Sequence, residues 1–194
     1  MNWLPLLLFI YSGFTINLVL QCALGIKGIV ESKTRFNIST LARLALIFLS
    51  VIFLWFLFSR LLYPLFAGVF IYVLLFPVSV IFYDGAEYLV FRYVLKTDAK
   101  SDSIISFPCG VTAAGVFICV NIADNFLEVL IMSFGFVFGI FLVNLVIREI
   151  RMRASLEAVP VFIRGRPLVL ITMGLLSLVF STVSVLLFRM IGAG

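Results

Sequence analysis

The feature that most constrains this chain is a series of six apolar segments. They cover roughly residues 3–26, 41–58, 65–82, 104–122, 126–147 and 168–191. A helix needs about 20 predominantly apolar residues to cross the hydrocarbon core of a bilayer. Hydrophobic residues make up 64% of the chain and charged residues 12%, which excludes an ordinary soluble domain. Because the apolarity is continuous and does not alternate, the segments predict membrane-spanning helices, not barrel strands.

The cationic side chains predict the orientation of these spans. Twelve of the 14 Lys and Arg residues follow odd-numbered spans, and only Arg60 and Arg189 lie on the opposite face. Short loops rich in Lys and Arg stay in the cytoplasm. We therefore expect both termini outside. The net charge of +5 is explained by this topology and does not indicate a nucleic-acid partner.

Six spans divide into two groups of three, and an odd number per group places the two groups in opposite orientations. We expect an all-α integral membrane protein of one domain, 1–194, with inverted three-helix repeats over 1–95 and 103–194. The first span of each repeat carries polar residues and glycines: Asn17, Gln21, Cys22, Gly25 and Gly28 in one, and Ser106, Pro108, Cys109, Gly110 and Thr112 in the other. The pattern predicts interrupted helices one and four, since unwound backbone in a membrane needs protein cover.

Candidate site residues are few. The chain has no histidine, so metal ligation depends on the thiols of Cys22, Cys109 and Cys119, each inside a predicted span. Cys109, between Pro108 and Gly110, is the best ligand candidate, although a buried cysteine also serves as a small packing residue. Asn17 and Gln21 lie one turn apart on one helix face, and with Thr112 they are candidates for a polar or ion path near the midplane.

The remaining polar residues allow two interpretations each. Asp84, Glu87, Asp124 and Glu128 either line an ion path or, within about a turn of a span end, reach interfacial water. Gly135 and Gly139 form a small-x-x-x-small pair that indicates close helix packing. The basic group either anchors helix ends in the interface or docks a soluble redox partner or acidic subunit. It comprises Arg148, Arg151, Arg153, Arg164 and Arg166.

Several strings resemble the RnfA and NqrE membrane subunits of bacterial Rnf and sodium-pumping NADH:quinone reductase complexes. They are Asn17-Leu18-Val19-Leu20-Gln21, Leu24-Gly25-Ile26, Asn125-Phe126-Leu127, Gly135-Phe136, Gly139, Ile147-Arg148-Glu149, Val159-Pro160-x-Phe162-x-Arg164-Gly165, Leu170-Ile171-Thr172, Gly174-Leu175 and Ser177-Leu178. The resemblance covers nearly the whole chain. It implies a multi-pass protein of the bacterial cytoplasmic (inner) membrane with both termini outside.

The resemblance also implies a partner and a cofactor. In the family, two homologous subunits of opposite orientation share one [2Fe-2S] cluster at mid-membrane, with two cysteines from each. Cys109 matches the second of these cysteines. The family's first cysteine lies in a Leu-Gly-Leu-Cys-Pro string, where this chain has Leu24-Gly25-Ile26-Lys27-Gly28. Cys22 is five residues earlier, about 7.5 Å of helical rise away, so it serves only after rearrangement. Otherwise three thiolates and another ligand hold the cluster, or it has been lost.

The expected function is that of a membrane subunit of an ion-translocating electron-transport complex of the Rnf or Nqr type. Electrons would pass between a cytoplasmic donor and an outer flavin-carrying subunit, coupled to Na⁺ or H⁺ movement. An oppositely oriented homologous subunit, similar to RnfE or NqrD, and flavin-carrying subunits are the implied partners. A first alternative is an inverted-repeat secondary transporter whose site combines Asn17, Gln21 and residues 108–112. A second is a membrane scaffold without a cofactor.

Overall fold

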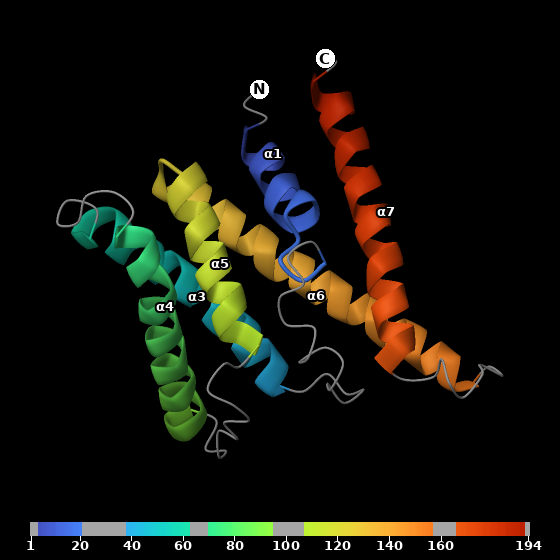
Figure 1. The fold of residues 1–194 in the computed structure, drawn as a ribbon, viewed down its shortest axis with the longest axis horizontal. Coiled ribbons are helices and arrows are strands. Elements are labelled where there is room, and N and C mark those ends of the chain that lie inside the picture. Colours follow the sequence, from blue (N-terminus) through green and yellow to red (C-terminus); the bar gives the residue numbers. More distant parts are fainter. Residues whose placement is uncertain (1–3, 21–37, 63–69, 95–106, 157–165, 193–194) are drawn as a thin grey trace.

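The computed structural model describes residues 4–20, 38–62, 70–94, 107–156 and 166–192, which form helices and no strands. The elements are α1 (Leu4–Ile10) with the π-helix η1 (Tyr11–Thr15), α3 (Ile38–Leu57) with η2 (Phe58–Leu62), α4 (Phe70–Leu89) with η3 (Val90–Val94), α5 (Phe107–Ile122), α6 (Phe126–Leu156) and α7 (Arg166–Gly192). Figure 1 shows these helices as one bundle. The all-α prediction is confirmed for this part of the chain.

Four apolar segments within these helices are long enough to cross a membrane: Thr40–Arg60, Tyr72–Tyr93, Phe126–Ala154 and Pro167–Leu186. Two further apolar helices, Leu4–Thr15 and Cys109–Ile122, are shorter. At 1.5 Å per residue they rise about 18 and 21 Å, less than the ~30 Å of a hydrocarbon core. The short helices belong to the first and fourth expected spans, of which residues 1–3, 21–26 and 104–106 lie outside the described ranges.

The longest helix, α6, has 31 residues and packs against α1, η1, α3, α5 and α7. A stripe of fully buried side chains follows it at intervals of three and four residues: Val129, Met132, Phe136, Ile140, Val143 and Ile147. This spacing places all six on one helical face. They belong to the core that also contains buried residues of α3, α4 and α5.

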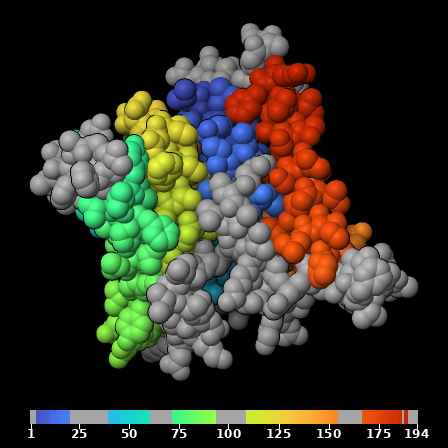
Figure 2. Space-filling model, in the orientation of Figure 1, coloured from blue at the N-terminus to red at the C-terminus, as the bar shows by residue number. Residues whose placement is uncertain are grey.

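The helices of the two sequence halves are interleaved. The first helix of the chain, α1 with η1, packs on α6 and α7 of the second half, whereas α5 packs on α3 and α4 of the first half. Figure 2 shows α1 and η1 lying between α5 and α7 on this face of the molecule. The start of α1 and the end of α7 lie at the same end of the bundle (Figure 1). Neither half therefore has a core of its own.

Close approach of η1 and α6 depends on Gly135 and Gly139. A Cβ on Gly139 would lie 2.5 Å from the Gly13 carbonyl oxygen, and a Cβ on Gly135 would collide with the Ser12 side chain. The packing role predicted for this glycine pair is confirmed. The rings of Phe9 and Phe138 lie beside the contact, with centroids 5.5 Å apart.

Candidate functional site

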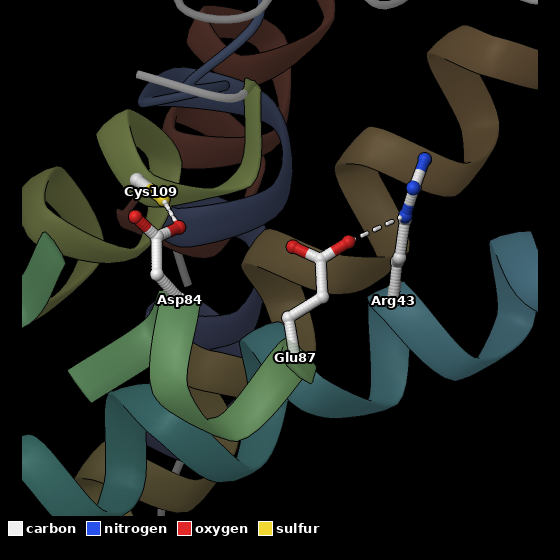
Figure 3. A network of polar contacts seen from close by, with 4 residues as sticks. All are labelled: Arg43, Asp84, Glu87 and Cys109. Atoms are coloured by element: carbon white, nitrogen blue, oxygen red, sulfur yellow. Dashed lines mark hydrogen bonds and ion pairs between the residues drawn. The ribbon is translucent and has the colours of Figure 1, made fainter. Parts of the chain in front are cut away.

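A polar contact between side chains joins α5 to α4. Cys109, in the first turn of α5, is fully buried, and its thiol donates a hydrogen bond to Asp84 Oδ1 at 2.8 Å. Figure 3 shows the two side chains pointing toward one another from their helices. A carboxyl and a thiol that are 25 residues apart in the sequence thus form one polar pair inside an apolar bundle.

The local sequence explains why Cys109 lies at the start of a helix. Pro108 is the second residue of α5, where the missing N–H of proline costs no helical hydrogen bond. The prediction that Pro108 and Gly110 interrupt the fourth span is therefore modified for the described residues, because α5 runs unbroken from Phe107 to Ile122. Thr112 Oγ1 donates to the Cys109 carbonyl oxygen at 2.9 Å and reinforces this first turn.

Asp84 lies well inside its helix, because the helix extends beyond the apolar run over 65–82. The helix continues past residue 82 through Leu89 and, as the π-helix η3, to Val94. Asp84 is therefore close to the middle of the apolar segment Tyr72–Tyr93, about 15 Å before the helix end. Ionisable side chains within membrane-spanning helices are functional candidates. The choice between an ion path and interfacial water for Asp84 stays a prediction.

Two neighbours of this pair were not singled out from the sequence. Tyr83 is fully buried, and its hydroxyl has no hydrogen-bond partner among the described residues. Arg43 on α3 forms an ion pair with Glu87, with Nε 3.0 Å from Oε1, and its guanidinium lies 5.3 Å from the Phe91 ring centroid. The two acids of α4 therefore have separate partners, as Figure 3 shows. The sequence feature that could have indicated Tyr83 is its position directly before an acid, Asp84, in an apolar run.

Asn17 terminates the first helix. Its Nδ2 donates to the Gly13 carbonyl oxygen at 3.1 Å, and its Oδ1 accepts from the backbone N–H groups of Val19 and Leu20 at 3.1 and 3.2 Å. The amide is buried and lies against Gly139 of α6. Because its carbonyl oxygen already accepts two hydrogen bonds, Asn17 acts here as a structural cap.

Of the other predicted site residues, Thr112 contacts the Cys109 backbone, and Asn17 packs against Gly139 of α6. Gln21, Cys22 and Lys27 lie outside the described residues. Cys119 is buried in the core within α5.

Glu128 caps the start of α6. Glu128 accepts hydrogen bonds from the Asp124 backbone N–H at 2.9 Å and from Asn125 Nδ2 at 3.2 Å. A side-chain acceptor at this point satisfies N–H groups that lack a helical partner. Of the predicted basic group, Arg153 pairs with Glu149 at 3.0 Å near the other end of α6.

The residues around Cys109 do not by themselves fit an iron-sulfur cluster. A [2Fe-2S] cluster takes four ligands, and cysteine binds it as a thiolate, whereas the Cys109 thiol donates its hydrogen to Asp84. Within the described residues no three Cys, Asp, Glu or His side chains converge to hold a metal ion. Further ligands would have to come from residues outside the described ranges or from another subunit.

The long apolar helices and the buried polar pair define the class of this molecule: it is a helical integral membrane protein. No known family model and no curated protein matches the chain.

Proposed function

We propose that this chain is a membrane subunit of an ion-translocating electron-transport complex of the Rnf or Nqr type, in the bacterial cytoplasmic membrane with both termini outside. The observation that carries the proposal is the Asp84–Cys109 contact, which gives a carboxyl group inside the apolar segment Tyr72–Tyr93 a hydrogen-bond donor from a second helix. An ionisable side chain in such a segment is a candidate for a role in transport. The family resemblance supplies the type of complex.

The packing of the helices supports the inverted repeat. In the inverted repeat, α1 with η1 would correspond to α5, α3 to α6 and α4 to α7. The packing of η1 on α6 then has its counterpart in the packing of α5 on α3, and the packing of η1 on α7 in that of α5 on α4. The contact between α3 and α6 maps onto itself under this correspondence. The first helix of the first proposed repeat, 1–95, ends at Thr15 in described residues, as expected for an interrupted helix.

In this proposal the transported ion passes the carboxyl group of Asp84, which points from α4 toward Cys109 on α5. Cys109 positions that carboxyl through the thiol hydrogen bond. Glu87, paired with Arg43, holds α3 and α4 in register. Asn17 caps the break in the first helix and keeps its backbone satisfied inside the protein.

The shared [2Fe-2S] cluster stays a prediction from the resemblance, with Cys109 as the described ligand and Cys22 as the candidate second ligand. It requires an oppositely oriented homologous subunit and a change in the protonation of Cys109. Purification of the complex with its native partners, followed by iron and flavin analysis and EPR, tests it. Loss of the iron-sulfur EPR signal in Cys109→Ala but not in Cys119→Ala would support Cys109 as a cluster ligand. A signal in Cys109→Ala as strong as that in Cys119→Ala would reject Cys109 as a ligand.

The ion-transport proposal has its own test. The complex is reconstituted in vesicles, and electron-transfer-driven ion uptake is compared between the wild type, Asp84→Asn and Glu128→Gln. We expect Asp84→Asn to lower uptake at least tenfold, as an order of magnitude for loss of a transport carboxyl, with Glu128→Gln near wild type. Equal uptake by Asp84→Asn and the wild type would overturn the role of Asp84. Substrate uptake without redox partners would favour a secondary transporter instead.

A further inference from the structure

An apolar groove lies between α3 and α4. Its walls are Leu46, Leu49, Phe53 and Phe56 from α3 and Phe82 and Ala86 from α4, and it has a volume of about 480 Å³. Both helices pack on α5. Phe53 of α3 and Phe82 of α4 stack at a centroid distance of 4.7 Å with an interplanar angle of 9°, so these rings join the two walls of the groove.

The groove faces away from the core. Leu49, Phe53 and Phe56 have 60%, 49% and 55% of their surface exposed, in a segment long and apolar enough to span a membrane. Such a surface contacts acyl chains in a bilayer. From Leu46 to Phe56 the helix rises about 15 Å, which is close to the hydrocarbon depth of one leaflet, half of ~30 Å.

A cationic group lies at one end of the groove. Arg43 is three residues before Leu46, about one helical turn from it, and its side chain is 46% exposed. Glu87 accepts a hydrogen bond from Nε of Arg43, and Figure 3 shows the far end of the guanidinium pointing away from Glu87. A guanidinium carries five N–H donors, so the terminal nitrogens can bind a phosphate with bidentate geometry.

We propose that the groove and Arg43 together bind one phospholipid of the leaflet at the N-terminal end of α3. One acyl chain lies in the groove against Phe53 and Phe82, and the phosphate accepts hydrogen bonds from Arg43. The occupant is a phospholipid because the groove has the length of a leaflet, an almost wholly apolar wall and a phosphate-binding group at one end. Glu87 and Phe91 orient Arg43 toward that end.

Retention of lipid by the purified complex tests this site. The complex is extracted in mild detergent, and bound phospholipid is quantified by native mass spectrometry and phosphorus analysis. Arg43→Gln removes the phosphate donors, and Ala86→Leu fills the groove while leaving the Arg43–Glu87 pair in place. Arg92→Gln is the matched control, because Arg92 is an exposed arginine whose guanidinium lies over Tyr88 on its own helix.

We expect Arg43→Gln and Ala86→Leu each to lower retained phospholipid by about tenfold, the effect of losing one charge-assisted contact, and Arg92→Gln to match the wild type. Two results would overturn the proposal: unchanged lipid in both groove variants, or an equal loss in Arg92→Gln. Release of a partner subunit by Ala86→Leu with unchanged lipid would also overturn it, since the groove would then hold a protein helix.

Discussion

Cys109 and Asp84 lie 2.8 Å apart, thiol sulfur to carboxyl oxygen, where the start of α5 meets the middle of the span in α4. The contact ties the second half of the sequence to the first at a point that is buried on the Cys109 side. It gives a carboxyl group in an apolar span a hydrogen-bond donor, which such a group needs.

The donor at position 109 can be tested through stability. Cys109→Ser retains a hydrogen on the side chain and should leave stability within about 1 kcal/mol of wild type. Cys109→Ala removes the donor and should cost about 1–3 kcal/mol, because the Asp84 carboxyl loses this partner. Thermal unfolding in detergent measures both. If the Cys109→Ala variant is as stable as the Cys109→Ser variant, the thiol hydrogen bond to Asp84 does not stabilise the fold.

The glycines of α6 should tolerate no side chain. Gly139→Ala places a Cβ 2.5 Å from the Gly13 carbonyl oxygen and 2.9 Å from Asn17 Nδ2, so η1 and the residues after it must move away from α6. We expect a loss of about 1–3 kcal/mol from overpacking, measured as a lower unfolding temperature. Gly174→Ala is the control, since a Cβ there meets nothing within 4 Å. Equal effects at the two positions would contradict the close packing of η1 on α6.

The cap at Asn17 should matter more than an asparagine within a helix. Asn17→Ala leaves the Val19 and Leu20 N–H groups and the Gly13 carbonyl without this side chain, which should cost about 2 kcal/mol or more. In Asn144→Ala only a donation to the Ile140 carbonyl is lost, and the cost should stay below about 1 kcal/mol. Hydrogen exchange at Val19 and Leu20 should accelerate in the first variant only; unchanged exchange would argue against the cap.

The two ion pairs should differ in strength. The Arg43 and Glu87 side chains are 46% and 14% exposed, whereas those of Arg153 and Glu149 are 73% and 48% exposed. A double-mutant cycle should give a coupling of about 0.5–1 kcal/mol for Arg43–Glu87 and about 0.3 kcal/mol for Glu149–Arg153, within the usual range for solvent-exposed pairs. A larger coupling for the second pair would contradict a role of the first in joining α3 to α4.

The apolar runs alone determined that this is a helical membrane protein, because continuous apolarity over a bilayer thickness has one common structural solution. The spacing of Gly135 and Gly139 likewise indicated close packing, since small residues one turn apart share a helix face. Both conclusions depend on interactions local to one segment, and the structure supports both.

Tertiary structure decided which residues meet. The apolar run ended at residue 82, yet α4 and η3 continue to Val94, and the fold brings Asp84 of this longer helix to Cys109 of α5. Asn17 looked like a site residue, and the fold uses its amide to cap a helix end. The Asp84–Cys109 and Arg43–Glu87 contacts join residues 25 and 44 positions apart. Hydropathy and spacing describe one helix at a time, whereas such pairs depend on which face each helix turns to its neighbours.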